Sequence, residues 1–504
     1  MRFRFILVFL LVLTFPLFSQ AATFNVTRHD DPPPGACDPN DCSLREAISA
    51  ANNSLDTDNE INLQAGETYV LEISGSLEDD NATGDLDLFR ILIPGNYTIN
   101  GNGATVQQTA EDDRVFDARS NILGGIVNLT INDLTVSGGG QNQANFFNGG
   151  GIQFSGTFVF EDLVLNNVWL LDNHSSSGGG ASVNSATLHL NESTLSENNV
   201  TFDGGGLELI QSVAEINNST LSDNTAENND GGAINCSDCV VVARNVTITN
   251  NHAPAGSAGG IGGDNIVLTL KNSILFDNDA LNQPTFQNCF GTFFIFDSDG
   301  FNILGDSGGG CEPQDPSDLS DDPLLLPLDD NGGSLGPTHL LGDNSPAIDG
   351  GDPAGCTDTD DNPLTTDQRG VPRPQGPHCD IGAVEMVICG DSTVGPGEEC
   401  DGGECCVQCQ FANSGTSCSG GACDSQGQCI PTSGGGNGGN GGGDGTGGGD
   451  GTGGGGDGGG GNGAGIPNDC SCHFGEIPAS LAWSNLWVLL PLMGAGLFRW
   501  RKRG

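Results

Sequence analysis

Two aspartates precede the glycine corners of an internal repeat and are the residues best placed to do chemistry. Asp203 stands before Gly204 and Asp230 before Gly231, 27 residues apart. If each repeat forms one turn of a β-solenoid, the two carboxylates lie about 5 Å apart, the spacing of hydrogen-bonded strands. A retaining glycosidase needs two carboxyl groups at about that distance. Because aspartate is also common in turns, a cation site and a solvated corner stay open beside catalysis.

Other enzymatic chemistry finds less support in the repeat. A polysaccharide lyase would need a basic group to take up a proton. Between residues 149 and 278 the basic side chains besides histidine are Arg244 and Lys271. No serine–histidine–aspartate order and no phosphate-binding loop stands out, so the sequence favours a protein without catalytic activity.

A short acidic loop is the candidate for calcium. Asp358, Asp360 and Asn362 alternate as oxygen ligands do at the start of a calcium-binding loop. The sixth position is Pro363 instead of glycine and the twelfth is Arg369 instead of glutamate. The segment is therefore not an EF-hand. Calcium is a candidate cofactor that would bind to these three residues or to carboxylates elsewhere in the chain.

One pattern repeated five times between residues 149 and 278 must position any such site. Asparagines recur at intervals of 25 to 27 residues: Asn173, Asn198, Asn224, Asn251 and Asn278. The positions three, eight and ten residues before each asparagine are apolar in every copy, and a glycine-rich corner punctuates each one. Period-two alternation with a fixed repeat predicts a parallel β-helix, whose apolar columns form a core when turns stack. The asparagines should form a structural ladder of hydrogen-bonded amides.

The composition of the chain limits which classes of partner it can bind and which cellular compartment it occupies. The chain has 504 residues with 15 Lys+Arg against 65 Asp+Glu, a formal net charge of -50. Nucleic acid and anionic membrane surfaces are poor partners for so acidic a surface because both are polyanions, and no nucleic-acid partner is expected. Residues 1–21 have the basic start, apolar run and small-residue end of a secretory signal peptide. With export, the 18 cysteines indicate disulfides in an oxidising compartment.

Residues 22–60 are predicted to form an N-terminal cap. Ser43 and Glu46 make a capping box, and the apolar residues that follow share one helical face. A Cys37–Cys42 disulfide would pin this short amphipathic helix over the open end of the stack, and Arg45 reads as helix surface charge. Less regular strands follow, at 69–73, 89–93, 97–99, 115–116 and 129–136, and strands at 293–296 and 301–304 finish the stack.

The string Cys42-Ser-Leu-Arg-Glu-Ala-Ile48 resembles the signature of the CSLREA domain of exported bacterial proteins with right-handed parallel β-helices. Gly-Gly-Ala-Ile at 231–234 is similar to repeats of polymorphic outer-membrane proteins. Segments at 345–349, 367–370 and 379–383 resemble the closing part of the same family. The resemblance spans residues 24–386 and implies an all-β, right-handed parallel β-helix over residues 61–388.

Three further segments follow the β-helix. Residues 389–431 hold eight cysteines and are predicted to be a disulfide-rich module, because so short a segment cannot bury an adequate core. The module resembles the Cys-rich repeats of myxobacterial surface proteins, while zinc at Cys405, Cys406 and Cys409 is the alternative use. Residues 432–469 are a flexible glycine-rich linker. Residues 470–504 carry a cysteine motif, an apolar stretch at 481–498 and a basic end.

This tail resembles the MYXO-CTERM sorting signal. The resemblance implies processing or lipid attachment at Cys470 or Cys472 and removal of the helix, and an ordinary transmembrane anchor is the alternative. We therefore expect an exported protein at a bacterial cell surface or outer membrane, or released from it. Its expected function is adhesion, recognition or envelope structure, with polysaccharide or another cell surface as partner. A polysaccharide lyase or glycoside hydrolase on a pectin-lyase-like β-helix is the alternative.

Overall fold

The computed structural model describes residues 21–387 except 76–79, 111–112, 141–147, 158–159, 281–286, 306–309 and 334. It also describes the backbone of five short strands in the Cys-rich module: β26 (Cys406–Val407), β27 (Gln410–Phe411), β28 (Ser417–Cys418), β29 (Gly421–Cys423) and β30 (Cys429–Pro431). Of the zinc alternative, only the backbone of Cys406 is described, while Cys405, Cys409, the linker, Cys470, Cys472 and the apolar tail lie outside the described residues. In the described part of the chain, no helix is both long and apolar enough to cross a membrane.

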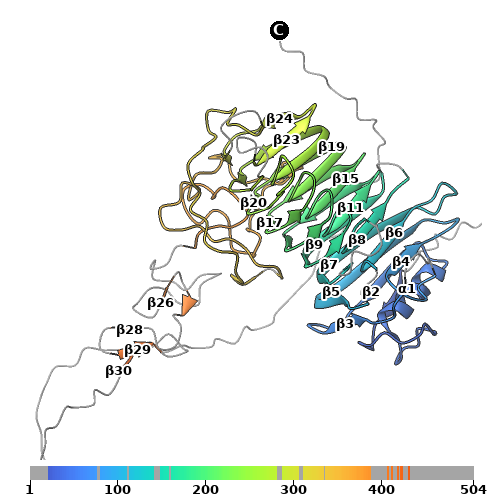
Figure 1. Cartoon of the computed structure of the whole chain (residues 1–504). Helices are drawn as coiled ribbons and strands as arrows, with labels where there is room; N and C mark the ends of the chain where they lie inside the picture. Colours follow the sequence, from blue (N-terminus) through green and yellow to red (C-terminus); the bar gives the residue numbers. More distant parts are fainter. Residues whose placement is uncertain are drawn as a thin grey trace, which may run out of the picture. The chain divides into compact units, whose positions relative to one another are not determined.

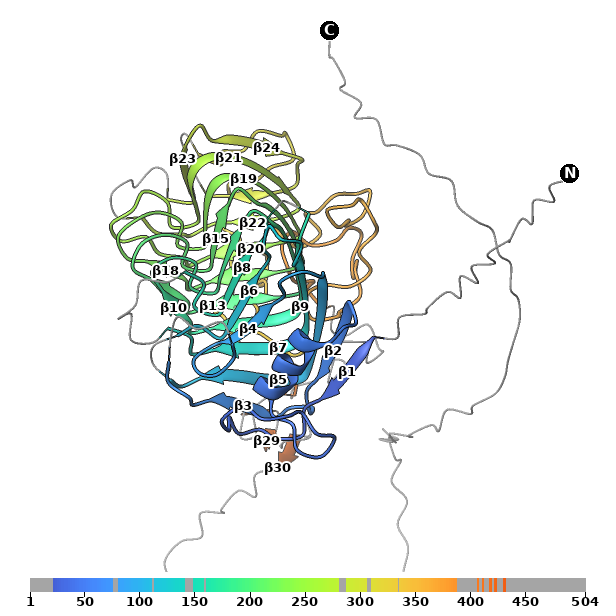
Figure 2. The same ribbon diagram turned by 90° about the vertical axis from the view of Figure 1, so that its right-hand side faces the viewer.

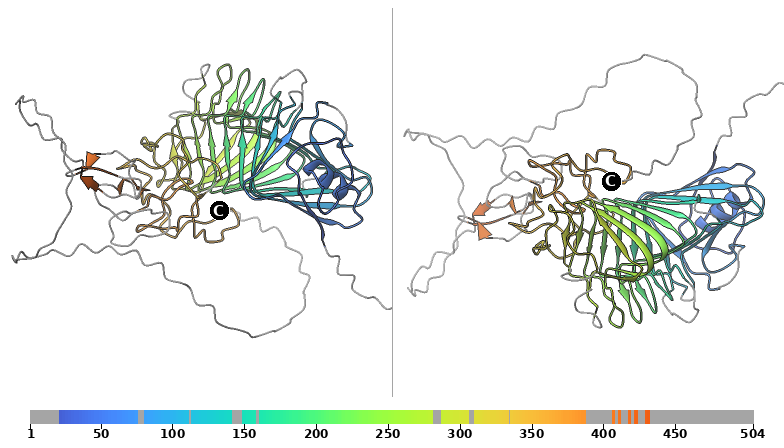
Figure 3. Two further views of the ribbon diagram at one scale, coloured as in Figure 1. Left: turned by 90° about the horizontal axis from the view of Figure 1, so that it is seen from below. Right: turned by 90° about the horizontal axis from the view of Figure 1, so that it is seen from above.

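Parallel strands from successive turns stack side by side in three faces of one solenoid (Figures 1 and 3). The first face is made by β1 (Ala22–Asn25), β2 (Asp58–Asn62), β12 (Thr187–Asn191), β16 (Val213–Asn217), β24 (Ile295–Ser298) and parts of the long strands β5 (Gly95–Gln108), β7 (Val127–Ser137), β9 (Asp162–Leu171), β19 (Ile234–Arg244) and β21 (Ile261–Lys271).

The other two faces repeat the arrangement with shorter strands. The second face joins β3 (Thr68–Leu71), β13 (Thr194–Ser196), β17 (Thr220–Ser222), β20 (Thr247–Thr249), β22 (Ile274–Leu275) and β25 (Ile303–Leu304) to the later parts of β5, β7 and β9. The third face joins β4 (Leu86–Phe89), β6 (Phe116–Arg119), β8 (Ile152–Ser155), β11 (Ala181–Asn184), β15 (Leu207–Ile210) and β23 (Cys289–Thr292) to the starts of β19 and β21. A short ladder, β10 (His174–Ser175), β14 (Asn199–Val200) and β18 (Thr225–Ala226), precedes the third face.

The predicted apolar columns are the core of this stack. Leu163 and Leu165 pair in register with Leu188 and Leu190 of the next turn, and all four are fully buried. Because a single turn cannot cover its own apolar face, each buried leucine depends on the turns above and below it. The parallel β-solenoid predicted from the repeat is therefore confirmed.

The N-terminal helix α1 (Leu44–Asn53) is also confirmed, with its capping box between Ser43 and Glu46 and the Cys37–Cys42 disulfide. Figure 2 shows it at the end of the stack beside β1 and β2. The interpretation of Arg45 as surface charge was wrong. Its guanidinium is fully buried, pairs with Asp31 at 2.7 Å and donates to the carbonyl oxygens of residues 83, 84 and 85. Arg45 ties the helix to the loop before β4.

A second correction concerns the strand expected at 89–93. The strand is β4, which ends at Phe89, and Ile91 and Leu92 are 57% and 72% exposed in the corner that follows. Apolar residues there imitate a strand, but the chain is already turning from the third face to the first. Apolar character alone cannot distinguish a buried strand from an exposed corner.

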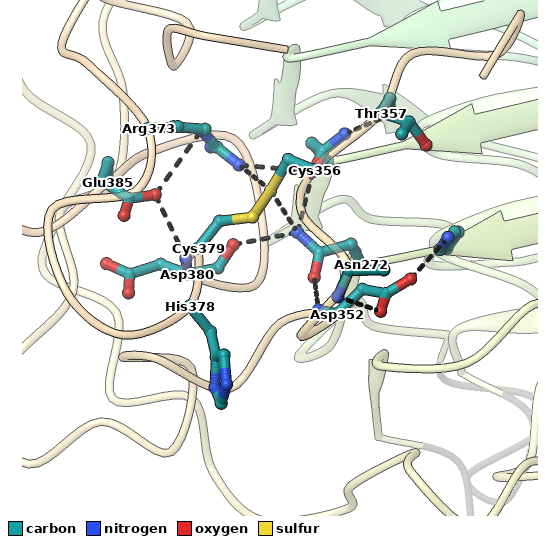
Figure 4. The surroundings of a disulfide bond; sticks show 12 residues. Asn272, Asp352, Cys356, Thr357, Arg373, His378, Cys379, Asp380 and Glu385 are labelled. Carbon is teal, nitrogen blue, oxygen red and sulfur yellow. Dashed lines mark hydrogen bonds and ion pairs between the residues drawn. A yellow bond between two sulfur atoms is a disulfide. The ribbon is translucent and has the colours of Figure 1, made fainter. Parts of the chain in front are cut away.

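Residues 319–386, here called the closing segment, lie over the outside of the second face (Figure 1). The segment is held by contacts far apart in sequence, such as Thr220 Oγ1 donating to Gln368 Oε1 at 2.6 Å. Figure 4 shows the Cys356–Cys379 disulfide within this segment next to Asn272 of the solenoid. The Asn272 amide donates to the Asp380 carbonyl oxygen at 2.9 Å. The second face is thus covered where these contacts form.

Candidate functional site

A groove of about 580 Å³ lies over the third face at β15, β19 and β21. Strand residues form its floor and the corner loops of the same turns form one wall. Its lining consists mainly of carboxylates, amides and hydroxyls, with three apolar side chains, Ile210, Ala255 and Phe290, among them. The lining includes Asp203, Glu208, Ile210, Asn228, Asn229, Asp230, Asn235, Ser237, Ser257, Asp264, Phe290 and Thr292.

Asp203 and Asp230, the two carboxylates singled out from the sequence, both line this groove. They occupy equivalent places in consecutive turns, because Gly204 N–H donates to the Asp230 carbonyl oxygen at 3.2 Å. Gly204 has φ of 68° and an added Cβ would meet the Leu207 carbonyl oxygen at 2.2 Å. Only glycine fits at position 204, so the conformation of Gly204 fixes the backbone of the corner next to Asp203.

The two aspartate side chains are held differently. Asp203 accepts hydrogen bonds from the Asn229 amide at 3.0 Å and the Asn235 amide at 3.3 Å. Burial raises the pKa of Asp203, against the opposing effect of the Asn229 hydrogen bond. The Asp230 carboxylate instead accepts the backbone N–H of Ser257. Both carboxylates therefore have donors from the next turn of the stack, which favours a positioning role in the groove wall.

Glu208 is a groove residue that the sequence interpretation missed. It points outward from β15 between the buried Leu207 and Leu209, and is itself only 8% exposed. In the stack it is in register with Ser182 and Asn235 of the adjacent turns. The signal was available in the repeat, because these three residues follow one another at intervals of 26 and 27.

The environment of Glu208 favours its protonated form. Burial raises the pKa of Glu208 to about 7, the Ser182 hydroxyl opposes this by donating at 2.8 Å, and the Asp203 charge adds to it. A carboxyl group that titrates near neutrality can give or take a proton at physiological pH. The groove can therefore offer both a proton donor and hydrogen-bond acceptors to a ligand.

The charged side chains that the structure describes along the groove are all acidic. Among its described lining residues are four carboxylates, Asp203, Glu208, Asp230 and Asp264, and no lysine, arginine or histidine. Carboxylates near one another raise each other's pKa and attract cations. An anionic ligand would meet repulsion throughout this groove.

A second acidic group lies at the N-terminal end of the same face. Asp85, Asp87 and Asp117 are buried, and they are the one group in the described chain whose carboxylate oxygens are close enough to hold a metal ion. Arg114 donates to Asp117 at 2.6 Å and lies 3.4 Å from Asp85. Burial, followed by the neighbouring aspartates, raises the pKa of Asp85 to about 9. Arg114 thus already supplies positive charge that a metal ion would bring.

The predicted calcium loop is not part of that group. Asp358 accepts the backbone N–H groups of Asp360 and Asn362 at 3.0 and 2.8 Å, and the Asn362 amide at 3.0 Å. Arg244 donates to the Asp358 carbonyl oxygen at 2.6 Å. The loop's own turn thus uses both side-chain oxygens of Asp358, and a calcium site at these three residues stays a prediction.

The asparagine ladder is buried inside the corner beside the third face. Side-chain amides donate to the next turn at 2.8 to 3.1 Å through Asn173, Asn198, Asn224, Asn251 and Asn278, and the ladder continues to Asn288. From Asn198 onward, each amide oxygen also accepts the backbone N–H of the preceding ladder residue. These asparagines satisfy backbone groups of the corner and leave no amide for a ligand.

An outer ladder on the opposite side was not foreseen. Here each amide donates to the preceding turn, at 2.8 to 3.2 Å, and the series ends on Thr359 of the closing segment. Its members are Asn25, Asn62, Asn100, Asn132, Asn166, Asn191 and Asn217. The two ladders run in opposite directions along the stack.

Comparison with known proteins returned no matching family model and no matching curated protein. The resemblances to the CSLREA domain and to the myxobacterial motifs therefore stay predictions, as do the domain boundaries drawn from the sequence.

Proposed function

We propose that this protein is exported, is displayed at a bacterial cell surface and binds a carbohydrate in the groove without converting it. The observation that carries the proposal is the groove itself, a preformed cleft of about 580 Å³ on a rigid parallel sheet. Ligand sites are typically concave and place a few polar groups among apolar ones. Amides and carboxylates suit sugar hydroxyls, and Ile210 and Phe290 offer apolar surface to a sugar ring.

Surface display rests on the sequence. The signal peptide, the glycine-rich linker and the apolar, basic tail together describe a domain held away from an envelope by a flexible tether. The tail would provide the contact with the membrane, and the partner would be extracellular polysaccharide or another cell surface. A net charge of -50 keeps nucleic acid outside this proposal.

Glycoside hydrolysis is the second candidate, and Glu208 is the observation that favours it. A carboxyl group with a pKa of about 7 could protonate a glycosidic oxygen, as a general acid does, while Asp203 or Asp230 acted as the second carboxylate. Asp203 accepts two amide hydrogen bonds and Asp230 accepts a backbone N–H. This restraint of both partners places hydrolysis second.

A panel of neutral, acidic and amino-containing polysaccharides separates the two functions. The full-length chain is incubated with each polymer while binding and the release of reducing or unsaturated ends are both measured. Binding without new ends supports the proposal. Product that is lost in Asp203→Asn, Asp230→Asn and Glu208→Gln variants would establish the enzyme instead.

We also propose calcium as a ligand, and beside the predicted loop at 358–362 the group formed by Asp85, Asp87 and Asp117 is a candidate site. The check is the melting temperature with calcium and with a chelator, in the wild type and in Asp87→Asn. A calcium-dependent rise that is lost in the variant would support the site. No rise in the wild type would overturn the calcium proposal and leave Arg114 as the counter-charge of these aspartates.

A further inference from the structure

Glu208 is the one buried carboxylate among the described residues of the groove, and the protein pairs it only in part. Its carboxylate has one hydrogen-bond donor among the described residues, the Ser182 hydroxyl, which contacts Oε2. The other oxygen, Oε1, has no donor there, although more than nine-tenths of the residue is buried and it lines the groove. Burying a carboxylate without full pairing costs free energy. A ligand that donates to Oε1 would recover part of that cost.

The charges around Glu208 define which donor suits it best. Asp203, Asp230 and Asp264 line the same groove, and no cationic side chain is among the described lining residues. A neutral hydroxyl would supply a hydrogen bond but leave the mutual repulsion of the carboxylates unchanged. An ammonium group would supply the hydrogen bond and the opposite charge together, which makes charge-assisted bonds the stronger kind. A uronic acid would add a further negative charge.

We propose that the groove binds a polysaccharide that carries free amino groups, with a sugar ammonium group donating to Glu208 Oε1. This inference rests on the carbohydrate-binding function proposed above and specifies its ligand. The strands run across the groove floor in register, so Glu208 and Asn235, and likewise Ser237 and Asp264, lie roughly 4.8 Å apart along it. An extended chain lying along the stack can therefore meet several of these groups in succession.

Matched oligosaccharides test the inference on the full-length chain. Isothermal titration calorimetry compares the glucosamine hexamer with the N-acetylglucosamine hexamer at pH 7, where a Glu208 carboxyl group with a pKa of about 7 is substantially ionised. Physiological salt is present, so that exposed charges are largely screened. We expect the amino oligomer to bind at least tenfold more tightly. The Glu208→Gln variant should lose that preference and retain the affinity for the acetylated oligomer. The control Asp297→Asn removes one exposed charge from the first face and should change neither affinity.

Each alternative outcome has a distinct meaning. Tighter or equal binding of the acetylated oligomer would overturn the amino-sugar inference but leave a carbohydrate-binding groove. Equal binding of a lysine hexamer, unaffected by Glu208→Gln, would show unspecific attraction to a polyanion and overturn the inference as well. If neither oligosaccharide nor any polymer of the panel binds, the proposed function itself fails. Hydrogen exchange of β15 checks that the variant keeps its fold.

Discussion

At the scale of single residues, Glu208 shows how stacking of turns can raise the pKa of a carboxyl group. Alternation along β15 points it outward, and the adjacent corners, one of which ends at Asp203, bury it in the groove. Neither effect is visible in the Leu-Glu-Leu string by itself. The energetic consequence is a dependence of local stability on pH.

The pKa of Glu208 rises from its ordinary 4.5 to about 7 on folding. Between those values the folded protein holds a proton that the unfolded chain releases, so the free energy of unfolding falls as pH rises through this window. We expect Glu208→Gln to stabilise β15 at pH 8 by about 1–3 kcal/mol and to have little effect at pH 4. Amide hydrogen exchange of β15 at both pH values measures this. Faster exchange in the variant at pH 8 would contradict it.

Alanine substitutions should destabilise the buried asparagine ladder through Asn224, here called the inner ladder, far more than the outer one. Asn224 accepts from the Asn198 backbone and amide and donates to the Leu195 carbonyl oxygen, all in buried surroundings. Asn224→Ala leaves these groups unsatisfied and should cost about 2–4 kcal/mol. The outer-ladder variant Asn191→Ala should cost less than about 1 kcal/mol, because water can reach its partly buried partners. Thermal unfolding of both variants compares the two; equal losses would refute the distinction.

At the scale of elements, the closing segment depends on a buried histidine. His339 Nδ1 donates to the Leu326 carbonyl oxygen at 2.7 Å, which leaves Nε2 to accept the Ser222 hydroxyl at 2.9 Å. Burial lowers the pKa of His339, while the Leu326 hydrogen bond and the charge of Asp223 oppose this. The contact joins β17 to a residue 117 positions away. It requires a neutral imidazole.

Acid should therefore loosen this contact. Because the unfolded histidine titrates near 6.5, the unfolded chain takes up a proton below that pH that folded His339 resists. Relative to His339→Gln, the wild-type closing segment should lose up to about 1.4 kcal/mol of stability per pH unit below 6.5. Hydrogen exchange of residues 319–386 at pH 7 and pH 5 tests this. The same pH dependence in both proteins would exclude His339 as its source.

The Cys356–Cys379 disulfide is the covalent counterpart of that contact. It joins residues 23 apart, whereas Cys236–Cys239 joins residues three apart. Because longer loops lose more entropy on closure, replacing Cys356 and Cys379 by serine should cost up to about 3 kcal/mol, more than the same change at Cys236 and Cys239. Limited proteolysis should cut the first variant within residues 319–386 and spare the solenoid. Cleavage inside the solenoid instead would show that the segment and stack unfold together.

At the scale of the whole molecule, charge is the dominant feature. A net charge of -50 repels itself in any compact state, and the carboxylates of the third face concentrate part of it. We expect the melting temperature to rise as sodium chloride increases from about 10 mM to 500 mM, because the Debye length falls from roughly 30 Å to a few ångströms. Calorimetry across that range is the measurement. An unchanged or falling melting temperature would show that local ion pairs, such as Arg45–Asp31, outweigh the net repulsion.

The sequence by itself determined the solenoid. The columns through Leu163 and Leu165 and the ladder through Asn224 recur at nearly constant intervals. The place of a residue in the repeat therefore predicts its turn and its face in the stack. The helix α1 was equally readable, because its capping box and apolar face are local features. Asp203 and Asp230 could be placed one turn apart for the same reason.

Only the tertiary structure revealed the features that depend on corner loops of unequal length or on contacts between segments far apart in the sequence. The outer ladder was hidden because its asparagines are 37, 38, 32, 34, 25 and 26 residues apart, as corner loops of unequal length shift the spacing. Arg45 became a buried anchor because a loop about 40 residues later folds over it. The protonation of Glu208 arises from burial by neighbouring turns, a property of the stack that no single repeat contains.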